Sequence, residues 1–121
     1  MQVITSFTTS PNQFHELVLE NNETVNFTLR YYPRMLSWFF DISYGDKTIN
    51  GVKVVLHPNI LRQFKNILPF GLMFYTDNNS PVEPFQPTDF QTGRVKMAIL
   101  NKEEVLQVES EVFNVEDKSL L

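Results

Sequence analysis

The sequence predicts a mainly β fold, either a small antiparallel β-barrel or a β-sandwich, with one short helix and a C-terminal extension. Three observations lead to this fold class: short runs of alternating apolar and polar residues, turn-forming residues between those runs, and one stretch with apolar residues at helical spacing. The chain has 121 residues, of which 42% are hydrophobic and 20% are charged. That length and composition are typical of one globular domain, so we expect a single hydrophobic core.

The first predicted hairpin lies within residues 13–32. Its second strand alternates strictly, and the polar stretch Glu20–Glu23 between the strands has the composition of a turn. Because successive side chains of a strand point to opposite faces, four apolar residues share one face. They are Val25, Phe27, Leu29 and Tyr31.

A further strand is expected over Ser37–Tyr44. We expect one of its faces to be buried, which leaves Phe39 on the opposite face for a second packing layer or a partner. The residues of the buried face are Trp38, Phe40, Ile42 and Tyr44. A turn at Gly45-Asp46 then leads into a strand over residues 47–56, with a bulge or a second turn expected at Asn50-Gly51.

The helical spacing occurs after this strand. Ile60, Phe64 and Ile67 recur three and four residues apart, so a short helix or helical turn is predicted here. Two more strands are expected, over residues 72–76 and 94–100.

A long loop with three prolines separates those two strands. Loops of this length are usually functional or pressed onto a neighbour, and residues 78–92 show no periodicity. Two interpretations stay open for Phe85 and Phe90. They either contact a partner or fold back as a lid over the core.

The net charge of −4 is concentrated at the C-terminal end. Residues 1–100 hold eight acidic and eight basic residues, whereas residues 101–121 hold six acidic and two basic ones. We therefore expect a domain over 1–100 and an acidic assembly arm over 101–121, whose periodicity fits either a helix or an added strand. The apolar residues expected to contact partners lie in the loop and the arm: Phe85, Phe90, Val105, Leu106, Val108, Val112, Phe113 and Val115.

No constellation of residues with catalytic spacing is visible. Asp41 and Asp46 are the nearest carboxylate pair, but Asp46 lies in a predicted turn and Asp41 on a mixed strand face. The chain has no cysteine, and its histidines are His15 and His57, which argues against disulfides and a zinc site. Motifs for phosphate loops and nucleophile elbows are also missing. The sequence predicts a protein that is not an enzyme and has no catalytic residues, cofactor or metal.

Membrane and nucleic-acid contacts are not expected either. No stretch approaches the roughly 18 apolar residues of a membrane helix, and the first residues lack the pattern of a signal peptide. Small β-barrels bind single strands by stacking bases on aromatic rings, but a neutral body with an acidic arm offers no basic groove. A small β-barrel binding module for single-stranded nucleic acid or peptide is kept as the alternative function, because the fold class suits it better than the charge does. The rings available to it are Tyr31, Tyr32, Trp38 and Phe39.

The order of strands and turns resembles the plug-like baseplate domain of contractile-tailed bacteriophages. The resemblance covers residues 14 to about 100, and GRVKMAIL at 93–100 is similar to the closing strand of that family. In this sequence Phe70 separates Pro69 from Gly71, and the acidic extension is longer than the end expected of the family. The matching segments are Phe27–Tyr31, Trp38–Asp41, Gly51–Leu56, Ile60–Phe64 and Pro69–Phe74.

The resemblance implies a function. Such domains are structural proteins of the virion, so the chain is expected in the tail baseplate after synthesis in the host cytoplasm. There it would join tail tube or hub proteins to surrounding baseplate proteins, with tube, hub, wedge or sheath proteins as partners. Several copies in a symmetric ring are expected.

Overall fold

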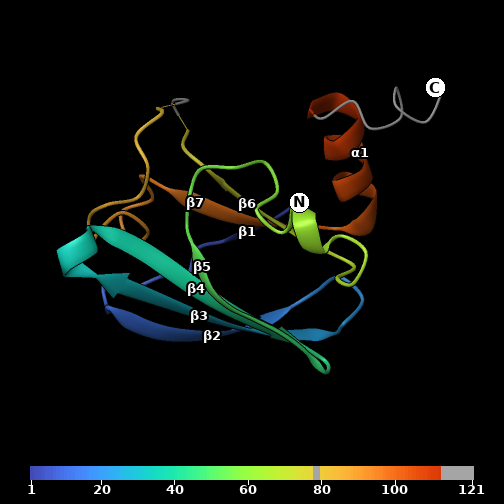
Figure 1. The fold of residues 1–121 in the computed structure, drawn as a ribbon, viewed down its shortest axis with the longest axis horizontal. Coiled ribbons are helices and arrows are strands. Elements are labelled where there is room, and N and C mark those ends of the chain that lie inside the picture. Colours follow the sequence, from blue (N-terminus) through green and yellow to red (C-terminus); the bar gives the residue numbers. More distant parts are fainter. Residues whose placement is uncertain (78–79, 113–121) are drawn as a thin grey trace.

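The computed structural model describes residues 1–77 and 80–112 and has two antiparallel sheets packed as two layers (Figure 1). The four-stranded sheet has the order β2-β3-β4-β5, with strands β2 (Asn12–Val18), β3 (Thr24–Tyr32), β4 (Ser37–Tyr44) and β5 (Lys47–Lys53). The three-stranded sheet has the order β1-β7-β6, with strands β1 (Gln2–Ile4), β7 (Lys96–Leu100) and β6 (Gly71–Tyr75). Within the described residues the sheets do not close into a barrel. The predicted mainly β class is confirmed, in its sandwich form.

The core lies between the two sheets, where the predicted strand faces meet. All four residues of the predicted face of β3 are buried, as are Trp38, Phe40 and Ile42 of β4, while Tyr44 is partly buried. The Phe40 ring lies 6.0 Å from the ring of Phe74, which belongs to the other sheet. Period-two alternation therefore identified the central strands and the side of each that packs inward.

Strand β1 was not predicted. It pairs antiparallel with β7, with Val3 opposite Ala98, and completes the three-stranded sheet. A strand of three residues is too short to produce a recognisable alternation.

The irregularity expected near Asn50-Gly51 is a β-bulge. Phe40 pairs with Val52 and Ile42 with Ile49, so β5 contains one more residue than β4 between these pairs. Gly51 has a φ of 68°, a conformation that glycine adopts without steric cost.

The short helix or helical turn predicted at residues 60–67 takes the form of turns and a short 3₁₀ helix, η2 (Arg62–Phe64). Asn59 is buried, and its Oδ1 accepts N–H hydrogen bonds from Leu61 and from Leu72 of β6. These bonds hold the segment against the sheet and replace the regular helical pattern.

The α-helix of the described residues is α1 (Lys102–Val112), within the predicted arm. Asn101 and Glu104 form a capping box: Asn101 Oδ1 accepts the Glu104 N–H over 2.8 Å, and Glu104 Oε1 accepts the Asn101 N–H over 3.0 Å. This reciprocal pair favours a helix that starts after Asn101. The choice that the periodicity left open is thereby settled for residues 102–112.

Candidate partner-binding site

The loop between β6 and β7 lies at one end of the sandwich and is held there by two core aromatics (Figure 1). The Tyr31 hydroxyl donates to the Phe85 carbonyl oxygen over 2.6 Å, and Trp38 Nε1–H donates to the Gln86 carbonyl oxygen over 2.9 Å. Both rings are buried, so their polar atoms need partners inside the molecule. Two carbonyl oxygens of the loop accept these hydrogen bonds, and the same bonds hold the loop in place.

A buried carboxylate organises the same loop. Asp89 is 1% exposed, and its Oδ2 accepts the N–H groups of Phe85 over 2.8 Å and Gln86 over 2.9 Å. Arg94 donates from Nε to Oδ1 over 2.7 Å and from its terminal nitrogen to Oδ2 over 2.8 Å. The guanidinium also binds the carbonyl oxygens of Val82 and Glu83. Asp89 and Arg94 therefore connect both halves of the loop.

The environment keeps Asp89 charged. Burial alone would raise the pKa of Asp89, but hydrogen bonds from Arg94 and from two backbone N–H groups outweigh it. The pKa of this carboxyl therefore lies below its usual range. Sequence reasoning missed the role of both residues, because an acid and a base five positions apart in a proline-rich loop form no recognisable motif.

The two phenylalanines of the loop have different environments. Phe90 is buried, and its ring lies 5.3 Å from Phe7, 5.4 Å from Trp38 and 5.9 Å from Phe74. Phe85 is 38% exposed, with the Arg94 guanidinium 5.5 Å from its ring centre. The lid interpretation thus describes Phe90, whereas Phe85 lies at the surface and stays a candidate partner contact.

Helix α1 packs on the opposite end of the sandwich (Figure 1). Buried Glu109 pairs with Arg62 over 2.9 Å and with Lys65 over 3.2 Å, which fixes the helix against the η2 segment. Within this helix the side chain of Val105 is buried and that of Val108 is half-buried. The exposed candidates on the helix are Leu106 and Val112, and the predicted contacts Phe113 and Val115 lie outside the described residues.

Two hollows lie beside this helix. One, of about 490 Å³, is lined by α1 and by residues 65–69, and its lining combines apolar residues such as Ile67, Leu68 and Leu106 with the charged Lys65, Lys102 and Glu109. The other, of about 260 Å³, lies at the ends of β1 and β7 and includes Leu19 and Phe70. Both volumes are near or within the range of ordinary binding pockets.

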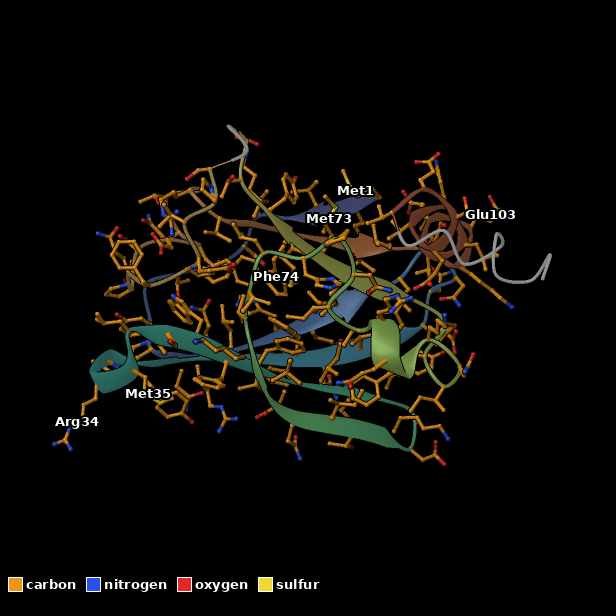
Figure 2. The ribbon with its side chains drawn as sticks, turned by 45° about the horizontal axis from the view of Figure 1, so that its top comes forward. Met1, Arg34, Met35, Met73, Phe74 and Glu103 are labelled. Carbon is orange, nitrogen blue, oxygen red and sulfur yellow. The ribbon has the colours of Figure 1, made fainter. Side chains whose placement is uncertain are left out.

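A third group of exposed apolar residues lies at the turn between β3 and β4. This tip comprises the 3₁₀ helix η1 (Pro33–Met35) and Leu36. Met35 is 59% exposed and Leu36 is 57% exposed. Figure 2 shows Arg34 and Met35 projecting from one end of the molecule, with Glu103 of α1 at the other.

The aromatic and acidic candidates for other chemistry are largely occupied. Trp38 and Tyr31 are buried, so they present no ring face to a nucleic-acid base. Asp41 accepts hydrogen bonds from Arg30 and from the Gly51 N–H, each over 2.7 Å, and serves the β-bulge. Asp46 is an exposed turn residue.

Residues 1–77 and 80–112 contain no group of three or more histidine, cysteine, aspartate or glutamate residues placed to hold a metal ion. None of their helices has the length and apolar character needed to cross a membrane.

Fold and surface together define a β-sandwich domain with exposed apolar residues at both ends. The family described as Cyanophage baseplate Pam3 plug gp18 matches residues 1–102. The chain therefore belongs to this family of phage baseplate proteins, which confirms the resemblance found from the strand order. No curated protein is significantly similar to the sequence.

Proposed function

We propose that the chain is a non-enzymatic structural component of a contractile-tail baseplate. In this role it joins tail tube or hub proteins to surrounding baseplate proteins, in several copies around the tail axis. The observation that carries the proposal is the family match over residues 1–102, which includes every strand of both sheets. The virion is then its site of action, and the host cytoplasm its site of synthesis.

The distribution of exposed apolar residues supports a joining role. The turn after β3 and the loop between β6 and β7 lie at one end of the sandwich and carry the exposed Met35 and Phe85, whereas α1 lies at the other end and carries the exposed Leu106 (Figure 1). Large exposed apolar side chains grouped on a small domain mark protein contacts. Two separate ends allow one copy to hold two neighbours at once.

The predicted contact residues divide into two roles within this proposal. Phe85, Leu106 and Val112 would touch partners directly, because their side chains are exposed. Phe90 and Val105 are buried and would act by holding the loop and the helix in position.

Electron microscopy of assembled tails tests the proposal. We expect density that fits the two-layered sandwich at the baseplate, in contact with tube or hub proteins. Tails that lack this density would contradict it. A pull-down of tail proteins, run beside a gel shift with single-stranded nucleic acid at low salt, provides a second test, and we expect binding only in the pull-down.

Two substitutions distinguish a contact residue from a core residue. Phe85→Ala should leave the melting temperature nearly unchanged and reduce incorporation into baseplates. Phe90→Ala should lower the melting temperature because it removes a ring from the core. A clear loss of stability in Phe85→Ala would show that this ring supports the fold and would remove it from the proposed contact surface.

A further inference from the structure

In the described part of the chain each sheet has two edge strands, and three of the four edges are covered, irregular or very short. On β6, Phe74 exchanges backbone hydrogen bonds with His57 over 3.0 and 3.1 Å. The edge strand β5 contains the β-bulge and has a lysine at each end, and β1 has three residues. Such features protect a sheet edge against added strands. Among the described residues, β2 has no bulge, lysine or covering strand.

The hydrogen bonds at the two ends of the β2–β3 hairpin show which backbone groups of β2 face outward. At one end the Pro11 carbonyl oxygen accepts the Tyr31 N–H over 2.8 Å. At the other end the Leu19 N–H donates to the Glu23 carbonyl oxygen, also over 2.8 Å. Because alternate residues of an antiparallel strand direct their N–H and C=O groups to the same side, the odd-numbered residues of β2 face β3. The even-numbered residues face the open edge, and Figure 1 shows β2 at the margin of its sheet.

Side chains satisfy only the two ends of this open edge. The Asn12 carbonyl oxygen accepts a hydrogen bond from Ser10 Oγ over 2.9 Å, and the Val18 carbonyl oxygen accepts one from a β1 side chain over 3.2 Å. Between these ends, the N–H and C=O groups of Phe14 and Glu16 form no hydrogen bond with a described residue. Two donors and two acceptors are thus spaced as in an extended backbone, and the group that matches them is another extended backbone.

The outward side chains of β2 give this edge its chemical character. Phe14 is 62% exposed and Val18 is 50% exposed, on either side of Glu16 on the outer face of the sheet. Glu16 is exposed and forms no ion pair within residues 1–77 and 80–112. Because opposite side chains on neighbouring strands interact directly, the best added strand has a basic residue opposite Glu16 and apolar residues on either side of it.

We propose that the β2 edge accepts an extended segment of a neighbouring baseplate protein as a fifth, antiparallel strand of the four-stranded sheet. The segment carries a basic residue between two apolar ones at alternate positions. Its backbone pairs with Phe14 and Glu16, and its side chains extend the outer face of the sheet. That the neighbour is a baseplate protein rests on the proposed function, whereas the strand-addition site rests on the geometry of β2.

A second copy of this chain is a poorer occupant of the same edge. The outward residues of β2 are Asn12, Phe14, Glu16 and Val18, and none of them is basic. Pairing of β2 with β2 of another copy would therefore leave both Glu16 side chains without a cation. Pairing between copies is an outcome that the test has to detect.

Amide hydrogen exchange tests the site on the full chain labelled with ¹⁵N. The probe is a short blocked peptide with valine, lysine and valine at its second, fourth and sixth positions and threonine at the others. At millimolar peptide we expect exchange of the Phe14 and Glu16 N–H groups to slow by about tenfold or more. The N–H groups of His15 and Leu17 face β3 and serve as internal controls, which should change much less.

Two control peptides separate backbone pairing from contact between side chains. N-methylation of the valine and lysine residues removes the donors that would face β2, so this peptide should give no protection. Glutamate in place of lysine should weaken binding several fold, because it would lie opposite Glu16.

A proline variant of β2 provides a second readout. Glu16→Pro removes an outward N–H without removing a hydrogen bond to β3, and proline is tolerated on edge strands. The variant should keep a cooperative melt, lose the peptide-induced protection at Phe14 and enter baseplates several fold less. Glu16→Thr is the matched control, because it changes the same side chain and keeps the N–H, so it should still gain protection from the peptide.

Unchanged exchange at Phe14 and Glu16 with millimolar peptide would overturn the proposal. Protection that appears without peptide and rises with the concentration of the chain would assign the edge to a second copy instead.

Exchange in assembled baseplates separates the site from the proposed function. A chain that is present there while its Phe14 and Glu16 N–H groups still exchange freely would exclude strand addition and leave the proposed function standing. A chain that gains protection from the peptide but is absent from baseplates would contradict the proposed function and leave the strand-addition site standing.

Discussion

Asp89 and Arg94 form a two-pronged ion pair inside the loop, with 2.7 Å between Arg94 Nε and Asp89 Oδ1 and 2.8 Å for the second contact. The carboxylate also caps two backbone N–H groups, so one buried side chain satisfies four donors. Removing its charge would leave Arg94 without a counter-ion in a partly buried position. Pairs of this kind are strongly destabilising to break, even where forming them adds little net stability.

Asp89→Asn should therefore lower the free energy of unfolding by about 3 kcal/mol. Urea denaturation at neutral pH measures the change. The matched control is Asp77→Asn, because Asp77 pairs with Lys96 at an exposed site. That surface pair should contribute no more than about 1 kcal/mol. Equal effects of the two substitutions would show that the loop does not depend on Asp89.

Stability should also fall as the pH is lowered from 7.5 to 5.5. Burial lowers the pKa of His15 and of His57, and the charge of Arg62 lowers that of His57 further. The unfolded chain then binds protons near pH 6.5 while the folded chain does not, so stability present above that pH is lost below it. Urea midpoints at the two pH values measure the loss.

Substitutions assign this pH dependence to its source. His57 Nδ1 accepts the Asn59 N–H over 2.9 Å, and His57→Asn offers a similar acceptor without a titrating group. The variant should show a smaller difference between pH 7.5 and 5.5. The depressed pKa of Asp89 acts in a separate window, because its contribution is present above an aspartate's ordinary pKa near 4 and is lost below it. An unchanged pH profile in His57→Asn would assign the effect elsewhere.

Gly71 is required by a close approach, since its φ is not positive. A Cβ at this position would lie 2.6 Å from Asn59 Oδ1 and 2.8 Å from Asn59 Cγ. Asn59 cannot move freely, because its Oδ1 holds the N–H groups of Leu61 and Leu72. We expect Gly71→Ala to lower the free energy of unfolding by about 1 to 3 kcal/mol. A variant with an unchanged denaturation midpoint would show that the Asn59 side chain moves without loss.

The local pattern of the sequence determined which features could be predicted. The faces of β3 and β4 follow from strict alternation, because one buried face imposes a period of two. The helical spacing at 60–67 indicated a helical segment but not its 3₁₀ form, and the contact between Asn59 and the distant backbone N–H of Leu72 leaves no local pattern. A signal for α1 was present at Asn101 and Glu104, which form its capping box. The prediction for the arm rested on apolar periodicity alone and did not use this capping motif.

The candidate surfaces were predictable only in part. Phe85 and Leu106 were named from their apolar character in a loop and an arm, and both are exposed. Phe90 is a phenylalanine of the same proline-rich loop as Phe85. Its position against Phe7 and Trp38 depends on contacts between residues far apart in the sequence, which the local pattern does not reveal. The exposed pair Met35 and Leu36 was missed because a turn of four residues has no periodicity.

Leu36→Gly should stabilise the isolated chain, because glycine adopts a positive φ without steric strain. The expected gain in the free energy of unfolding is up to about 1 kcal/mol, since the greater flexibility of glycine in the unfolded state offsets part of it. Met35→Gly is the control, as Met35 is equally exposed and has no positive φ, and it should give no gain. A loss of stability in Leu36→Gly would show that the leucine side chain supports the fold.

A chain that ends at Leu100 should fold and yet fail to enter baseplates. The core between the two sheets remains complete without α1. The truncation removes the buried side chain of Val105 and the ion pairs of Glu109 with Arg62 and Lys65. We therefore expect a cooperative melt with a loss of about 2 kcal/mol, comparable to the burial of one valine side chain. Val105→Ala in the full chain is the control, because it weakens the same packing while keeping the arm, and it should still be incorporated. A truncated chain that does not fold would make α1 part of the core, and one that is incorporated normally would remove the arm from the assembly surface.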